Sequence, residues 1–288
     1  MIKVKNLIKT YGNFTALDKV NFEVEKSTIH GLLGENGAGK TTTMRCLLGL
    51  TYADSGEMYI NDDLVARKNN NIRKKVSYLA GDFRPYENFT AQNYFKYILS
   101  IEKNISKKYL ELAERFKLDL RKKIKELSKG NKQKVGIIQA FMKDPQILIL
   151  DEPTSGLDPN YQKVFRDLIF EEKSEGKTIL LSSHDLLEIS NCCDFVTIIR
   201  DGKVIASQSK SEIEKKSLRI IKVKFNVPPS IQKLDGLDFI KSFESNDDQI
   251  SFMISNDVNS FIKFISDYEI IDMESENSNL SDTLMEYF

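Results

Sequence analysis

One stretch of the chain, Gly34–Thr42 with the sequence GENGAGKTT, restricts the possible folds more than any other. It matches the phosphate-binding loop pattern, in which four residues separate two glycines and the second glycine is followed by lysine and a hydroxyl residue. The preceding segment, Thr28–Leu33, is typical of a short buried strand, and Met44, Leu47 and Leu48 recur at helical spacing after the loop. This context of strand, loop and helix predicts an α/β fold with a nucleoside triphosphate site.

The residue types within the loop suit a polyanion. Glycine backbones can turn their N–H groups inward around phosphate oxygens, which a Cβ atom would obstruct. A helix that opens near Lys40 would point the positive end of its dipole at the phosphates. Lys40 can bridge the outer phosphates, and the Thr41 hydroxyl can ligate magnesium. The candidate nucleotide contacts in the loop are Gly34, Asn36, Gly37, Ala38, Gly39, Lys40, Thr41 and Thr42.

Composition and charge argue against several classes of protein. The 42 basic and 42 acidic residues cancel, so the bulk charge offers no attraction to nucleic acid or to an anionic membrane. No apolar run approaches the roughly 18 residues needed to span a bilayer, and Met1–Lys5 lacks the apolar core of a signal peptide. Cys46, Cys192 and Cys193 make a poor disulfide framework and are predicted to be packing residues in a reducing cytosol.

Two further apolar runs end in residues that suit phosphate chemistry. Ile147–Leu150 is typical of a parallel strand buried on both faces, and Asp151 and Glu152 follow it directly. Carboxylates at that end of a strand lie beside the phosphate loop in an α/β sheet, where Asp151 can hold magnesium and Glu152 can polarise a water. Thr178–Ser182 is a second such strand, and His184 just beyond its end is well placed to touch a γ-phosphate.

Helix signals and one aromatic residue add weaker indications. Ser128 opens a helix with a stripe of apolar residues, so its free N–H groups form a second potential anion site. Asp158 is predicted to cap another helix, with Pro159 at the first helical position. Tyr11 lies on a turn ahead of the phosphate loop, where it can stack on a nucleotide base or simply pack against the protein. The sequence leaves both roles of Tyr11 open.

Taken in order, these motifs are similar to those of an ATP-binding cassette (ABC) transporter nucleotide-binding subunit. The resemblance implies an α/β P-loop NTPase of ABC type, with a mixed sheet core at residues 1–210 and a helical subdomain at about 85–145. It also implies ATP hydrolysis with ATP and Mg2+ as cofactors, and Lys40, Glu152 and His184 as catalytic residues. The matching motifs are Tyr11, Gly34–Thr42, the signature Leu127–Asn131, Ile147–Glu152, Ser155–Asp158 and His184.

The resemblance implies partners as well. Members of the family form head-to-tail dimers, here a homodimer or heterodimer, in which Ser128 and Gly130 would contact the γ-phosphate bound to the opposite subunit. Asp158 is a further nucleotide-binding candidate. A separate transmembrane permease would carry the transport path, which places this subunit at the cytoplasmic face of the membrane, most simply in an exporter. Nucleic acid is not an expected partner. The alternative is a soluble ABC protein of translation or DNA maintenance, but such proteins carry tandem cassettes or long coiled coils that this chain lacks.

Two positions depart from the family pattern. Lys129 and Asn131 replace the glycine and glutamine of the commonest signature. A glutamine that touches the magnesium normally follows the strand at Val76–Leu79, and here that position is Gly81. The adjacent Asp82 is predicted to act as a metal ligand with Thr41 and Asp151, because a carboxylate is a good ligand for a hard cation. In the alternative interpretation, water fills the position and Asp82 only caps the following turn.

The segment Phe83–Phe95 is rich in aromatic residues, and in the family this region faces the membrane subunit. Exposed aromatic rings suit such a contact. For Tyr94 and Phe95 we weigh packing inside the helical subdomain equally, because both belong to a segment with helical periodicity.

Residues 218–288 are predicted to form a separate accessory domain of α+β type. Ile221, Val223 and Phe225 alternate with polar residues, as strand residues do, and so do Ile250, Phe252 and Ile254. A helical stripe starts at Val258, and Leu280, Leu284 and Phe288 predict a last short helix. This mixture suggests a ferredoxin-like module. It contains no catalytic set, so we expect a role in regulation or dimer contact.

Overall fold

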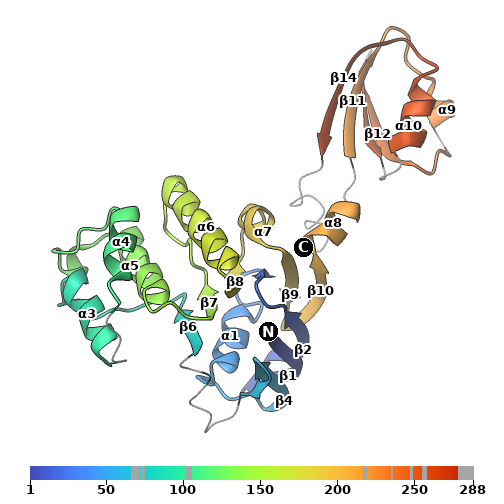
Figure 1. Cartoon of the computed structure of the whole chain (residues 1–288). Coiled ribbons are helices and arrows are strands. Elements are labelled where there is room, and N and C mark those ends of the chain that lie inside the picture. Colours follow the sequence, from blue (N-terminus) through green and yellow to red (C-terminus); the bar gives the residue numbers. More distant parts are fainter. Residues whose placement is uncertain are drawn as a thin grey trace. The chain divides into compact units, whose positions relative to one another are not determined.

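The computed structural model describes residues 1–65, 72, 75–101, 106–216, 219–234, 236–246, 249–254 and 258–277. The chain divides into two compact units, Met1–Ser207 and Gln208–Phe288, which are described separately (Figure 1). The residues Arg67–Lys75 are polar and basic, which predicts a solvated loop and helix face, and most of them lie outside the described residues. The helix predicted at Leu280–Phe288 lies outside them as well. No helix among the described residues is long and apolar enough to cross a membrane.

An antiparallel sheet carries the N-terminus. Its strand order is β2-β1-β4-β5. The apolar side chains that alternate along β1 and β2, among them Ile2, Val4 and Val24, are buried in the main core. The β1–β2 pairing contains register irregularities and continues to a hairpin at Tyr11 and Phe14. The strands are β1 (Ile2–Tyr11), β2 (Phe14–Val24), β4 (Ser55–Ile60) and β5 (Asp63–Leu64).

A second sheet has the order β10-β9-β3-β8-β7-β6. Its strands are β3 (Ile29–Leu33), β6 (Val76–Leu79), β7 (Ile147–Asp151), β8 (Thr178–Ser183), β9 (Phe195–Arg200) and β10 (Lys203–Ser209). The pairs from β6 to β9 are parallel. Every residue of β3, β7 and β8 is buried, as the continuous apolar runs predicted. Because β8 lies between β3 and β7, the carboxyl ends of these three strands meet at one edge.

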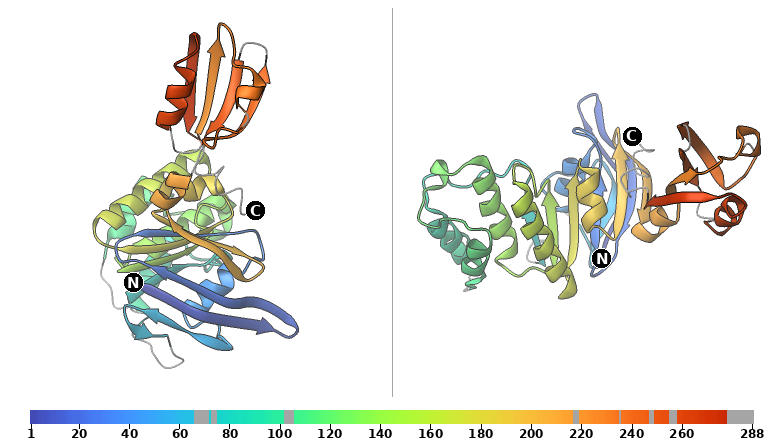
Figure 2. Two further views of the ribbon diagram at one scale, coloured as in Figure 1. Left: turned by 90° about the vertical axis from the view of Figure 1, so that its right-hand side faces the viewer. Right: turned by 90° about the horizontal axis from the view of Figure 1, so that it is seen from above.

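Helices flank the parallel sheet. They are α1 (Lys40–Leu47), α3 (Ala91–Ile101), α4 (Lys108–Arg115), α5 (Lys129–Phe141), α6 (Pro159–Ser174) and α7 (Leu186–Cys192), with a short 3-10 turn at Ile124–Glu126. Figures 1 and 2 show α3, α4 and α5 gathered beside β6 as a helical subdomain. Phe95 and Phe116 are fully buried there and Tyr94 is nearly so. The structure therefore favours interior packing for Tyr94 and Phe95.

The C-terminal unit begins with α8 (Lys210–Lys216) and continues with a βαββαβ arrangement. Its elements are β11 (Arg219–Phe225), α9 (Ile231–Leu234), β12 (Ile240–Asn246), β13 (Gln249–Ile254), α10 (Val258–Ile265) and β14 (Ile270–Asn277). The sheet order is β12-β13-β11-β14 and all its pairs are antiparallel, which is the ferredoxin-like arrangement. Phe225, Phe252 and Phe261 lie fully buried in its core.

Candidate functional site

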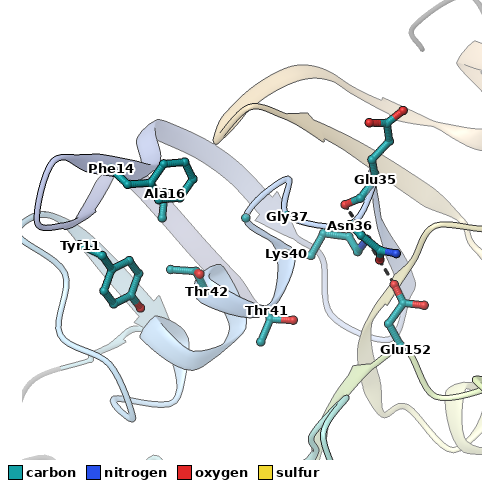
Figure 3. Close-up of a pocket in the computed structure, with 11 residues that line it drawn as sticks. Tyr11, Phe14, Ala16, Glu35, Asn36, Gly37, Lys40, Thr41, Thr42 and Glu152 are labelled. Carbon is teal, nitrogen blue, oxygen red and sulfur yellow. Dashed lines mark hydrogen bonds and ion pairs between the residues drawn. The ribbon is translucent and has the colours of Figure 1, made fainter.

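A pocket lies between the β1–β2 hairpin, the phosphate loop and the end of β7. Figure 3 shows Tyr11 and Phe14 at one end of it and Glu152 at the other. The predicted Tyr11 is half exposed, and Phe14, which sequence reasoning missed, is more exposed still. A second aromatic in the same turn was the only local signal for Phe14. The lining residues are Tyr11, Phe14, Ala16, Glu35, Asn36, Gly37, Gly39, Lys40, Thr41, Thr42 and Glu152.

The phosphate loop has the curled backbone that its glycines allow. Gly37 and Gly39 have φ angles of 88° and 109°, in the left-handed region that favours glycine. A Cβ atom at Gly34 would lie 2.3 Å from the Ile199 carbonyl oxygen, and one at Gly39 would lie 2.7 Å from Leu17 Cδ2. The α1 helix starts immediately after the curl, at Lys40. Its free N–H groups therefore face the pocket as the motif predicted.

Lys40 is buried and makes contacts that connect the loop to the predicted catalytic residues. Its Nζ donates to the Gly34 carbonyl and, at 3.2 Å, to the Glu35 carbonyl. The same Nζ lies 3.2 Å from Glu152 Oε1, and Glu152 Oε2 lies 2.8 Å from His184 Nδ1. Lys40, Glu152 and His184 thus form one connected set.

Asp151 is the centre of a hydrogen-bonded group beneath the loop. It is fully buried, and it accepts from Thr41 Oγ1 at 2.7 Å and from Ser182 Oγ at 2.6 Å. Ser182, the last residue of the apolar run at Thr178–Ser182, also accepts from the Glu152 N–H at 3.0 Å. The sequence carried no signal for this role of Ser182, because it depends on the pairing of β7 with β8.

The surroundings of Asp151 suit a magnesium ion. Thr41 and Asp151 offer the hydroxyl and carboxylate oxygens that hard cations prefer. A Cβ atom at position 81 would lie only 3.2 Å from Asp151 Oδ2. Because Gly81 has no Cβ atom, the space beside the Asp151 carboxylate stays open. The residues present therefore fit Mg2+, with Thr41 and Asp151 as the groups that would hold it.

Asp82 has a different partner in the structure. Its exposed carboxylate pairs with Arg45 of α1, with Arg45 Nη2 3.1 Å from Asp82 Oδ1. Gly81 is the residue of this loop that lies close to Asp151 in space. Asp82 faces helix α1 instead. This geometry favours an ion pair with Arg45 over the predicted role of Asp82 as a metal ligand.

The signature residues do not line the pocket that contains Lys40. Ser128 caps α5 and its Oγ accepts from the Asn131 N–H at 3.3 Å. A Cβ atom at Gly130 would lie 2.6 Å from the Gly156 carbonyl oxygen, so only glycine fits there. Asp158 caps α6 as predicted, accepting from two backbone N–H groups. Within one subunit these residues therefore lie outside the lining of the nucleotide pocket.

The α5 helix nevertheless contacts the catalytic segment of its own chain. Gln133, nearly buried, donates to the carbonyl of Glu152 at 3.2 Å and to that of Pro153 at 2.8 Å. Glu152 itself has a φ of 48°, a left-handed conformation that costs a residue with a side chain some free energy. The hydrogen bonds from Gln133 and to Ser182 stabilise this unusual backbone.

Comparison with known proteins decides the family. A family model described as ABC transporter matches residues 17–155. The lantibiotic transport ATP-binding protein SrtF of Streptococcus pyogenes is 35% identical over 207 residues, which cover 71% of this chain and 89% of that protein. This chain belongs to the ABC transporter ATP-binding proteins. An uncharacterized ABC transporter ATP-binding protein of Methanocaldococcus jannaschii is 41% identical over 210 residues, covering 71% of this chain and 76% of that protein.

A solved structure of a dimeric ATP-binding cassette, in a post-hydrolysis state with ADP and Pi, is similar to this ABC protein. It matches with a TM-score of 0.66 and 25% identity over 73% of this chain and 99% of that one. The α/β P-loop fold of ABC type is thereby confirmed, and so is the prediction of an ATPase. The chain is the ATP-binding and ATP-hydrolysing subunit of an ABC transporter, and the relatives give no support to the alternative in translation.

Proposed function

We propose that this ABC subunit hydrolyses ATP with magnesium as a dimer, at the cytoplasmic face of a membrane, and drives export through a separate transmembrane subunit. The connected set of Lys40, Glu152 and His184 carries the proposal, because it joins a phosphate-binding cation to a carboxylate suited to orient water. Export is supported by similarity to a lantibiotic transport ATP-binding protein.

Each group of pocket residues has a separate role in ATP binding or hydrolysis. The loop N–H groups and Lys40 bind the outer phosphates, and Tyr11 and Phe14 offer aromatic rings for the adenine base. Thr41 and Asp151 would hold magnesium, which when bound neutralises charge on the phosphate oxygens. Phosphate oxygens compete with Glu152 for Lys40, so nucleotide binding frees the Glu152 carboxylate to orient a water. His184 then hydrogen-bonds either the Glu152 carboxylate, as it does in the structure, or the γ-phosphate.

A dimer is supported by the position of the signature and by the dimeric relative. Ser128 and Gly130 lie outside the lining of their own subunit's pocket, yet the N-terminus of α5 has free N–H groups that suit an anion. In a head-to-tail dimer they would complete the site of the opposite subunit, together with Asp158. The dimer can be a homodimer or pair this chain with a second nucleotide-binding subunit.

The Glu152→Gln variant tests the proposal. It should bind ATP at least as tightly as the wild type, because the Glu152 charge no longer competes for Lys40, lose about 10²- to 10⁴-fold in turnover, and accumulate an ATP-dependent dimer in size-exclusion chromatography. Glu25→Gln, at an exposed acid outside the pocket, serves as the matched control and should behave as wild type. Equal turnover by the Glu152→Gln variant and the wild type would sink the assignment of Glu152.

A further inference from the structure

Glu188, in the first turn of α7, is a third carboxylate near the site, in addition to Asp151 and Glu152. It has no part in the mechanism above. Burial is the main cause of a raised pKa at this group, and the charges of Glu152 and Asp185 raise it further. A carboxylate that is desolvated in this way needs hydrogen-bond donors to remain ionised. Its partners are therefore informative about its role.

Both oxygens of Glu188 are hydrogen-bonded to hydroxyl groups. Oε1 accepts from Thr154 Oγ1 at 2.8 Å, and Oε2 accepts from Ser183 Oγ at 2.6 Å. Thr154 comes two residues after Glu152, and Ser183 directly precedes His184. One carboxylate thus bridges the segment that carries Glu152 and the segment that carries His184.

The bridge occurs where the sheet no longer joins these segments. The β7–β8 pairing ends at Asp151 and Ser182, one residue before Glu152 and two before His184. Beyond that point the backbone of Glu152 is left-handed, with a φ of 48°. Side chains must therefore set the distance between the two catalytic groups.

The α7 helix fixes Glu188 relative to His184. Asp185 caps α7 by accepting from the Leu187 N–H at 2.8 Å, and its own N–H donates to Ser183 Oγ at 2.9 Å. The Ser183 hydroxyl is thus held by Asp185 while it donates to Glu188. Hydrogen bonds therefore connect both ends of the segment Ser183–Glu188, which includes His184.

We propose that Glu188 is a positioning residue for ATP hydrolysis, which holds the Thr154 and Ser183 segments so that the Glu152 carboxylate and the His184 imidazole meet. The inference rests on the proposed roles of Glu152 and His184. The two hydroxyl partners of Glu188, Thr154 and Ser183, lie outside the lining of the nucleotide pocket. Its effect should act mainly through the positions of the Glu152 and His184 side chains, so it should appear in kcat and not in ATP affinity.

The experiment compares Glu188→Ala with the conservative Glu188→Gln. The alanine variant should lower kcat by roughly 10- to 100-fold, the scale expected when reacting groups are misplaced by about 1 Å, while KM for ATP and binding of a fluorescent ATP analogue stay at wild-type values. The glutamine variant should recover most of kcat, because its amide can accept from one hydroxyl and donate to the other. Asn191→Ala, at an exposed position of the same helix, is the control and should keep wild-type kcat.

Single-hydroxyl variants keep the test decisive if Glu188→Ala does not fold. Thr154→Val and Ser183→Ala each remove one bond to Glu188, and each should lower kcat at unchanged KM. In the double variant Thr154→Val/Glu188→Ala the loss should equal that of Glu188→Ala alone, since both substitutions break the same bond. Wild-type kcat in Glu188→Ala, or in both single-hydroxyl variants, would overturn the proposal. Full activity in Glu152→Gln would instead refute the proposed catalytic carboxylate, whatever Glu188 does.

Discussion

Lys40, which opens α1, and Glu152, which follows β7, form an ion pair in which Nζ lies 3.2 Å from Oε1. The same lysine also donates to two carbonyl groups of the phosphate loop. These three acceptors all interact with the Lys40 ammonium group, which the phosphates of ATP would also bind. Nucleotide binding and the release of Glu152 are therefore coupled through one side chain.

Replacing Lys40 should weaken nucleotide binding itself. In Lys40→Ala the phosphates lose a charge-assisted donor worth about 1.5–3 kcal/mol, so the dissociation constant for ATP should rise at least about tenfold. Equilibrium titration with a fluorescent ATP analogue measures this. Lys26→Ala, an exposed lysine in a turn outside the pocket, should bind as the wild type does. An unchanged dissociation constant in Lys40→Ala would show that the loop N–H groups bind the phosphates without it.

A magnesium titration distinguishes the two carboxylates near the phosphate loop. Asp151 is buried against Thr41, whereas Asp82 is exposed and pairs with Arg45. We expect Asp151→Asn to raise the magnesium concentration for half-maximal hydrolysis several-fold, because it removes one charged oxygen ligand. Asp82→Ala should stay close to wild type. A shift in Asp82→Ala as large as in Asp151→Asn would restore the role of Asp82 as a metal ligand.

Tyr86 is predicted to contact the transmembrane subunit. It is 59% exposed, and its ring packs against Phe89 and Tyr97 with centroids 5.8 Å apart in each pair. In Tyr86→Ala, ATP binding and the basal ATPase rate should be unchanged, while stimulation by the reconstituted transmembrane subunit should fall. Phe170→Ala, an exposed aromatic on α6, is the control. Undiminished transport by Tyr86→Ala would count against docking at this residue.

His30 should make the stability of its domain depend on pH. The side chain is buried between Phe22 and Phe195, and burial lowers the pKa of His30 from 6.5 to about 4. The unfolded chain therefore takes up this proton at a higher pH than the folded chain does. Stability is lost as the pH falls from 6.5 to about 4, by up to about 3 kcal/mol, and no further below that.

In the structure His30 Nε2 lies 2.8 Å from Thr197 Oγ1. The His30→Gln variant tests the pH dependence, because it removes the titrating group and keeps a polar side chain that can bond Thr197. Denaturant unfolding at pH 7 and at pH 4.5 should show a smaller difference in free energy for the variant than for the wild type. Parallel pH profiles for the two proteins would show that His30 does not contribute.

Local patterns were enough to predict the elements that position the site. Strands β3, β7 and β8 are continuous apolar runs because both of their faces are covered, and the phosphate loop needs glycine wherever its backbone curls. The caps at Ser128 and Asp158 are likewise local, since each side chain bonds N–H groups two or three residues ahead. The strands β12 and β14 were missed, because they lie at the edges of their sheet and most of their side chains are exposed.

Contacts between distant segments could be read only from the tertiary structure. The order of strands in the sheet brings Ser182 to Asp151 and lets Glu188 bridge Thr154 and Ser183. Neither contact leaves a periodic signal in the chain. The partner of Asp82 was undecided for the same reason, because the loop after β6 can present its carboxylate to Asp151 or to Arg45 with the same sequence. Periodicity and capping record which faces of an element are buried and where it ends, whereas the choice of partner depends on packing across the whole domain.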